Sequence, residues 1–317
     1  MSRQSELAQL GRVFDNSALS NRNLIINGAM QVWQRGTSFN GSGYTADRWF
    51  QASNNTNAIT QNSVTLPNGD AANTLKVTAT GSVSEWFDIY QVVEDYKRLL
   101  GKTVTMSGWV RTNINGVVFR KYSDQNLSSV VPNDGAWHYI EATFTPDVSG
   151  GAVRGPTGST FGVTFNAPLS VVSGDYYEFA QVQLELGDTA TPFEHRPYGQ
   201  ELALCQRYYQ QYLQKYRNAV YFSLANFFVF DRQELSQTMR ASPTCTWKSG
   251  SIYLAINGQN TASSTMYAGS SSYGFSGATI TGATFVINRQ AGGVTPSNCL
   301  VYNTEVTDAI FAFDAEL

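Results

Sequence analysis

The feature that most restricts the fold of this chain is a strict alternation of apolar and polar residues in well-separated segments. It occurs in LKVTATG (75–81), KTVTMSGWVRT (102–112), WHYIEATFTP (137–146) and YYEFAQVQLELG (176–187). A period of two residues is the side-chain period of a half-buried β-strand. Several such strands separated by turns indicate a β-sandwich or a barrel.

The composition agrees with this prediction. Aromatic residues make up 13% of the 317 residues, and charged residues only 14%, against roughly 25% in typical soluble domains. Gly, Ser, Thr and Asn fill the spaces between the aromatics, a mixture that favours strands and tight turns. We therefore expect an all-β protein.

The charge of the chain bears on its partners. Its 21 basic and 24 acidic residues are scattered and give a net charge of −3, which argues against nucleic acid, because phosphate binding needs clustered Lys and Arg. The apolar stretches fall short of the ~20 residues that span a bilayer, so no membrane insertion is expected. The N-terminus has no apolar core of the secretory type, so we expect the protein to be made and kept in a cytosol.

The chain divides into three predicted parts. Residues 1–22 read as a short amphipathic helix and a linker, suited to attachment to a partner. Residues 23–197 carry most of the alternating strands. Residues 198–317 form a smaller β-rich domain that opens with a predicted helix, and a switch into a strand near Tyr208 is equally compatible with its tyrosine-rich second half.

Chemistry-bearing patterns are sparse. Both histidines, His138 in an alternating strand and His195 in a turn, lack a recognisable nucleophile partner, and no phosphate loop or G-x-S-x-G elbow occurs. The three cysteines lie at wide spacing (Cys205, Cys245 and Cys299), which favours three buried thiols over a zinc site. We expect no catalytic activity, no cofactor and no metal.

Aromatic residues beside amide, carboxyl and hydroxyl groups suggest glycan recognition. A sugar ring needs a flat apolar partner for its face and polar groups for its hydroxyls. The candidate glycan-binding residues are Trp86, Asp88 and Tyr90 in one segment, and Tyr267, Tyr273 and Phe275 in the Gly/Ser-rich loop predicted at 257–282. Trp33, Trp49 and Trp109 are weaker candidates, because their strands carry the main apolar pattern.

Two stretches carry a family resemblance. NLIINGAMQVWQRGTSF, followed by YTADRW (44–49), resembles the opening of a family of bacteriophage tail fibre and receptor-binding proteins. QVQLELGDTATPFEHRPYGQELALCQRYYQ (181–210) is similar to the joint of that family, and TMRASPTCT (238–246) and the terminal FDAEL resemble its later segments. The strand pattern between them resembles that of jelly-roll carbohydrate-binding modules.

The resemblance implies a jelly-roll sandwich at 23–197, able to bind host surface polysaccharide or lipopolysaccharide, and a homotrimeric domain at 198–317. The chain would then be a tail fibre or receptor-binding protein of the virion, which adheres to host glycan without cleaving it. Its N-terminal segment would join other tail proteins. The alternatives are a purely structural tail or baseplate protein and, less favoured, a polysaccharide depolymerase.

The segment 23–36 is expected to form the first strand of the jelly roll, with Asn27 and Gly28 in a turn or bulge. Trp33 would then pack in or against the sandwich.

Overall fold

We analysed a computed structural model of the chain. It describes residues 22–53, 57–82, 87–94, 96–121, 125–126, 130–146, 162–166, 171–214, 219–222, 227–230, 233–241, 243–252, 273–279, 282–288 and 306–316. The predicted N-terminal helix at 1–22 lies outside these residues, except for Arg22.

The chain forms two compact units, and the second comprises Ala203–Glu316. The division falls inside helix α2 (Tyr198–Gln206), within a few residues of the boundary at 197 that the sequence predicts. Each unit is described by itself below.

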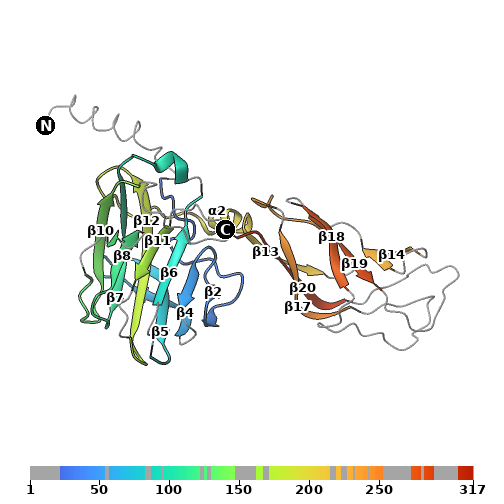
Figure 1. Ribbon diagram of the computed structural model, residues 1–317, viewed down its shortest axis with the longest axis horizontal. Coiled ribbons are helices and arrows are strands. Elements are labelled where there is room, and N and C mark those ends of the chain that lie inside the picture. The colour runs from blue at the N-terminus through green and yellow to red at the C-terminus, as the bar shows by residue number, and fades with distance from the viewer. Residues whose placement is uncertain are drawn as a thin grey trace. The chain divides into compact units, whose positions relative to one another are not determined.

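The first unit is a β-sandwich of two six-stranded sheets, and every strand pair in them is antiparallel (Figure 1). Sheet A has the order β1 (Ser38–Asn40), β4 (Asn57–Thr65), β5 (Ala71–Ala79), β12 (Tyr176–Leu186), β7 (Val104–Thr112) and β10 (His138–Phe144). Sheet B has the order β2 (Gly43–Tyr44), β3 (Phe50–Ser53), β6 (Phe87–Val92), β11 (Gly162–Asn166), β8 (Val118–Lys121) and β9 (Gln125–Asn126). The predicted all-β sandwich is confirmed.

The core lies between the two sheets and is formed by the apolar phase of each alternating strand. Val104, Met106 and Val110 of β7 are fully buried in it. The hydroxyl of Tyr177, on sheet A, donates a hydrogen bond to the carbonyl oxygen of Phe87, on sheet B, at 3.2 Å. Complete burial raises the pKa of Tyr177 well above its ordinary value, so this link between the sheets stays protonated and neutral.

The segment 23–36 does not form the strand that the sequence predicts; it is a series of turns. Its centre is Asn27, which is fully buried and has a φ of 59°, a conformation that Asn tolerates better than most residues. The Asn27 side chain donates to the carbonyl oxygens of Val32 and Asp47 and accepts from the amides of Gln31 and Val32. Since these buried polar groups satisfy one another, the segment needs no sheet partner. Trp33 packs against the core, as predicted.

This turn segment lies along one side of β12. Pairing of β12 with β5 ends at Phe179, and an irregularity between Ala180 and Gln183 follows, with Gln181 at a φ of 50°. Beyond it, the Leu24 amide donates to the carbonyl oxygen of Leu184 at 2.7 Å. The β-bulge therefore moves β12 from one partner to another.

A close backbone approach completes this contact. The Val182 amide donates to the Gly28 carbonyl oxygen at 2.9 Å, and a Cβ added at Gly28 would lie 2.1 Å from the carbonyl oxygen of Val182. Only glycine fits at this position without a shift of the backbone.

Helical structure is short. Residues Tyr96–Leu99 form the 3-10 helix η1, which is followed by Gly101 at a φ of 71°, a conformation that glycine adopts readily at the end of a helix. Helix α2 passes at once into strand β13 (Tyr209–Gln214), so the switch near Tyr208 is confirmed. Among the residues that the structure describes, no helix is both long enough and apolar enough to cross a membrane.

The second unit contains two antiparallel sheets. One has the order β13, β20 (Val306–Asp314) and β17 (Thr244–Ile252). The other has the order β14 (Ala219–Phe222), β15 (Phe227–Phe230), β19 (Gly282–Asn288) and β16 (Gln233–Glu234), with β18 (Tyr273–Thr279) paired to β19.

The three segments of this unit that carry the family resemblance meet around Tyr208, which is fully buried. Its carbonyl oxygen accepts from the amide of Ala315, and the neighbouring Arg207 carbonyl oxygen accepts from the amide of Arg240. The guanidinium groups of Arg207 and Arg240 lie 5.9 and 5.8 Å from the Tyr208 ring centroid. These motif residues therefore form part of the internal structure of the unit.

The contact at Gly28 can be tested by substitution. We expect Gly28→Ala to lower the free energy of unfolding by about 3 kcal/mol, because the added methyl group must displace backbone. Urea unfolding followed by tryptophan fluorescence measures this. The matched control is Gly199→Ala, since a Cβ there meets nothing within 4 Å and alanine favours a helix by up to about 1 kcal/mol. Equal stability of the two variants would contradict the assignment.

The bulge residue Gln181 also makes a pH-sensitive contact. A hydrogen bond from Gln181 is the main cause that lowers the pKa of Asp70, with further contributions from Asn68 and His195. Because the folded pKa is lowered, the stabilisation is present above the unfolded value of about 4 and is lost as the pH falls below it.

We expect Gln181→Gly, which keeps the positive φ, to raise the pKa of Asp70 in a carboxyl ¹³C NMR titration. The pKa of Asp134, which is lowered mainly by a hydrogen bond with His138, serves as the internal control. A change at both carboxyl groups would show a general structural effect instead.

Candidate functional site

The predicted glycan-binding residues fall into three groups. Trp86 and Tyr267 lie outside the described residues. Tyr273 and Phe275 lie two residues apart in strand β18, opposite Ile287 and Phe285 of β19. The predicted loop at 257–282 is therefore wrong over 273–279, where Tyr273 and Phe275 lie in a paired strand, a setting that suits aromatic residues.

Asp88 and Tyr90 lie on β6, with side chains on the outer face of sheet B. Phe87 and Ile89 of the same strand belong to the main core, so the alternation directs Asp88 and Tyr90 away from it. Both are nearly covered, with 8% and 9% of their surface exposed. Tyr90 belongs to a separate small apolar cluster with Ala52 and Val92, against which Phe50 packs.

An aromatic row crosses β2, β3 and β6 on this outer face, formed by Tyr44, Phe50 and Tyr90. The Tyr44 and Phe50 rings meet edge-on with centroids 5.1 Å apart, and the Phe50 and Tyr90 centroids lie 5.2 Å apart. The guanidinium of Arg35 lies 5.1 Å from the Tyr44 ring centroid. Tyr44 and Phe50 are half-buried, so the row is more open at its Tyr44 end.

The turn segment positions the open end of this row. The buried carboxylate of Asp47 accepts from Gln34 at 2.6 Å and forms an ion pair with Arg35 at 3.4 Å. The Asp47 amide donates to the carbonyl oxygen of Val32 at 3.1 Å. Since Asp47 lies between Tyr44 and Phe50 in the chain, this network fixes Arg35 relative to both rings.

The aromatic row joins flat apolar surface to polar groups, the combination that a sugar ring requires. The sequence pattern indicates Asp88 and Tyr90 of this face but not Arg35, Tyr44 and Phe50. Strands of two and four residues are too short to show an alternation. The available signal was that these residues lie in or next to WQRG and YTADRW, two of the segments that carry the family resemblance.

The outer face of sheet A presents a second group of aromatic residues. Trp109 and Tyr139 are cross-strand partners, with ring centroids 5.4 Å apart, and Tyr139 is 43% exposed. Arg111 forms an ion pair with the fully buried Glu178 through two hydrogen bonds of 2.9 and 2.7 Å.

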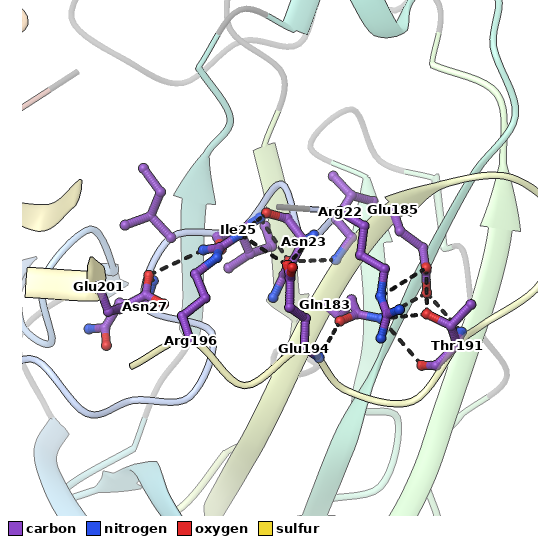
Figure 2. Close-up of polar contacts among 12 residues, drawn as sticks. Arg22, Asn23, Ile25, Asn27, Gln183, Glu185, Thr191, Glu194, Arg196 and Glu201 are labelled. Carbon is purple, nitrogen blue, oxygen red and sulfur yellow. Dashed lines mark hydrogen bonds and ion pairs between the residues drawn. The ribbon is translucent and has the colours of Figure 1, made fainter. Parts of the chain in front are cut away.

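Figure 2 shows a polar network that joins the first and the last segment of the sandwich. We call residues 22–31 the incoming segment, residues 191–201 the outgoing segment, and the contacts between them the end clamp. Arg196 is its centre, with a side chain only 6% exposed. Arg196 donates to the carbonyl oxygens of Asn23 and Ile25 and forms ion pairs with Glu194 at 3.5 Å and Glu201 at 3.3 Å.

The end of β12 supports the outgoing segment. Gln183 accepts from the amide of Glu194 at 2.8 Å and donates to Glu185 at 2.8 Å. Both carboxylate oxygens of Glu185 accept from Thr191, at 2.8 Å from its amide and 2.7 Å from its hydroxyl. The motif QVQLELG…TPFEHRP therefore contains residues that fold back on one another.

Each of the two histidines lies near a carboxylate. His138 pairs with Asp134 at 3.0 Å, and His195 lies 3.9 Å from Asp70. Both pairs lie at the surface. Within the described parts of the chain, no group of three or more potential metal-ligating residues occurs.

The sequence matches no protein-family model and no curated protein sequence. Among solved structures, it is similar to the CBM22-1 xylan-binding domain of Paenibacillus barcinonensis Xyn10C, with 12% identity, a TM-score of 0.31, and coverage of 48% of this chain and 94% of that one. It is also similar to the family 11 carbohydrate-binding module of a Clostridium thermocellum cellulosomal cellulase, with 15% identity, a TM-score of 0.30, and coverage of 48% and 98%.

A third similar structure is the enzymatically active domain of bacteriophage CBA120 tailspike protein 4. It has 12% identity and a TM-score of 0.36, and the match covers 52% of this chain and 22% of that one. At these identities and TM-scores the similarities assign this chain neither a ligand nor an activity.

Proposed function

We propose that this chain is a bacteriophage tail fibre or receptor-binding protein that adheres to host cell-surface glycan without cleaving it. The aromatic row on the outer face of sheet B is the observation that supports glycan binding best. The family resemblance of the segments around Asn27, Asp47 and Arg196 supports the assignment to a virion tail.

The row suits a sugar chain because its parts match the two surfaces of a pyranose ring. The half-buried rings of Tyr44 and Phe50 offer apolar area to C–H groups. Arg35, held against Tyr44 and Asp47, offers N–H donors to hydroxyl or carboxylate oxygens, since a guanidinium only donates.

A shallow row of this kind gives a weak single site, and multivalency compensates for it. In the proposal the second unit assembles as a homotrimer and the N-terminal segment attaches the protein to other tail proteins in the host cytoplasm. Three sites on one trimer, and several trimers on one virion, bind far more tightly than one site.

A purely structural role in the tail or baseplate is the second candidate. The observation in its favour is that Ala52, Tyr90 and Val92, although on the outer face of sheet B, are at most 9% exposed. These residues are already covered within the chain, so this part of the face offers little area to a sugar.

A binding assay with the full chain separates the two candidates. We expect the purified protein to bind host cells and extracted surface polysaccharide, and Tyr44→Ala to weaken glycan binding roughly tenfold, or about 1.4 kcal/mol. Glycan-array and surface-binding measurements give the affinity, and release of reducing ends from the polysaccharide reports any cleavage.

The control variant is Tyr139→Ala, which removes an exposed tyrosine from the outer face of sheet A and should bind as the wild type does. Failure of the wild type to bind either cells or polysaccharide would support the structural role. Release of new reducing ends would overturn the proposal that the glycan is not cleaved.

A further inference from the structure

The contacts of the end clamp follow a regular order along the incoming and outgoing segments. Arg22 donates to the carbonyl oxygen of Pro192 at 2.5 Å, and the Asn23 amide donates to Glu194 at 2.9 Å. Further along both segments, the carbonyl oxygen of Ile25 accepts from Arg196 at 3.1 Å, and the Asn27 amide donates to Glu201 at 2.5 Å.

These four contacts advance together along both segments, from 22 with 192 to 27 with 201. Figure 2 shows them in the same order, with Arg22 at one end and Asn27 and Glu201 at the other. The incoming and outgoing segments therefore run parallel to each other. A fifth contact, from the Gln31 side chain to the Arg196 carbonyl oxygen at 3.2 Å, does not follow this order, because the incoming segment turns at residues 26–29.

The clamp is also fixed to the middle of sheet A. The Asn23 side chain accepts from the Leu184 amide at 3.1 Å and donates to the Val182 carbonyl oxygen at 3.1 Å. On its other side β12 pairs with β7 along the same stretch. The incoming segment is thus held by the outgoing segment and by a central strand at the same time.

The parallel direction determines how the clamp responds to tension. A pull on the chain before residue 22 and an opposite pull after residue 201 act at opposite ends of two parallel segments. The contacts are then loaded in shear, all together, whereas antiparallel segments would be peeled apart one contact at a time. Because the contacts share the tension, the clamp must break as one cooperative unit.

We propose that the end clamp is a mechanical tie. It bears the tension between the first and the last segment of the sandwich, so that the strands between them are not loaded. This goes beyond glycan adhesion and does not depend on it. Tension along the chain is the condition that a protein attached at one end and adhering at the other must withstand, whatever partner it adheres to.

Single-molecule pulling on the full chain, with handles attached enzymatically at its two termini, tests the tie. Unfolding of the stretch from Arg22 to Leu202 is recognised by its length, because a fully extended chain of this size adds about 600 Å. We expect the wild-type sandwich to unfold in one step. We expect Arg196→Ala to accelerate its unfolding under a fixed force by roughly tenfold or more, because the clamp contacts are broken in the mechanical transition state.

The matched control is Arg111→Ala, which removes an arginine that is paired with a buried glutamate of the same sheet but lies outside the clamp. It should lower stability in urea as Arg196→Ala does, yet leave the unfolding rate under force within about twofold of the wild type. A purely stabilising role of Arg196 predicts that both variants change the rate under force in proportion to their stability in urea, and that result would overturn the proposal.

Glu201→Gln provides a second variant, in case Arg196→Ala does not fold. It keeps the shape of the Asn27 contact and removes the charge that faces Arg196, so it should accelerate unfolding under force by a smaller factor. Stepwise unfolding of the wild type that begins at low force with short length increments would show peeling of the strands and would also overturn the tie.

Discussion

The buried guanidinium of Arg196 is the interaction on which the rest of the sandwich depends. A charge that is removed from water costs several kcal/mol unless it is paired and hydrogen-bonded. Arg196 meets this requirement only if the carbonyl oxygens of Asn23 and Ile25 and the carboxylates of Glu194 and Glu201 are all in place. The start of the sandwich and its end must therefore fold together, which closes the unit.

The same turn segment links this closure to the proposed glycan face. The backbone amide of Asn27 donates to Glu201, and its side chain donates to the carbonyl oxygen of Asp47. Asp47 in turn holds Arg35 beside the Tyr44 ring. One chain of buried polar contacts therefore runs from the end clamp to the aromatic row. Because hydrogen-bonded buried groups hold one another in position, the position of the row depends on the fold of the turn segment.

Elements that depend on local interactions could be predicted from the sequence, whereas those that depend on contacts between distant residues could not. The strands around Val104 and Leu184 were readable because their alternation is local. At 23–36 the Asn-Gly pair correctly indicated a turn, but the strand predicted around it was wrong, because contacts with residues distant in the sequence bury its apolar residues. Of the aromatic row, only Tyr90 gave a sequence signal, together with Asp88 of the same strand, whereas Tyr44 and Phe50 joined Tyr90 through sheet pairing.

The sequence by itself determined the all-β fold class, since this depends on the period of the side chains, and it left open whether the helix after residue 198 continues or switches into a strand near Tyr208. Only the tertiary structure decided which face each aromatic ring occupies and that Arg22, Asn27, Arg196 and Glu201 meet. These residues lie as many as 174 positions apart. Their contact arises from the bulge at Gln181 and the close approach at Gly28, which bring β12 against the incoming segment, and no local pattern encodes that meeting.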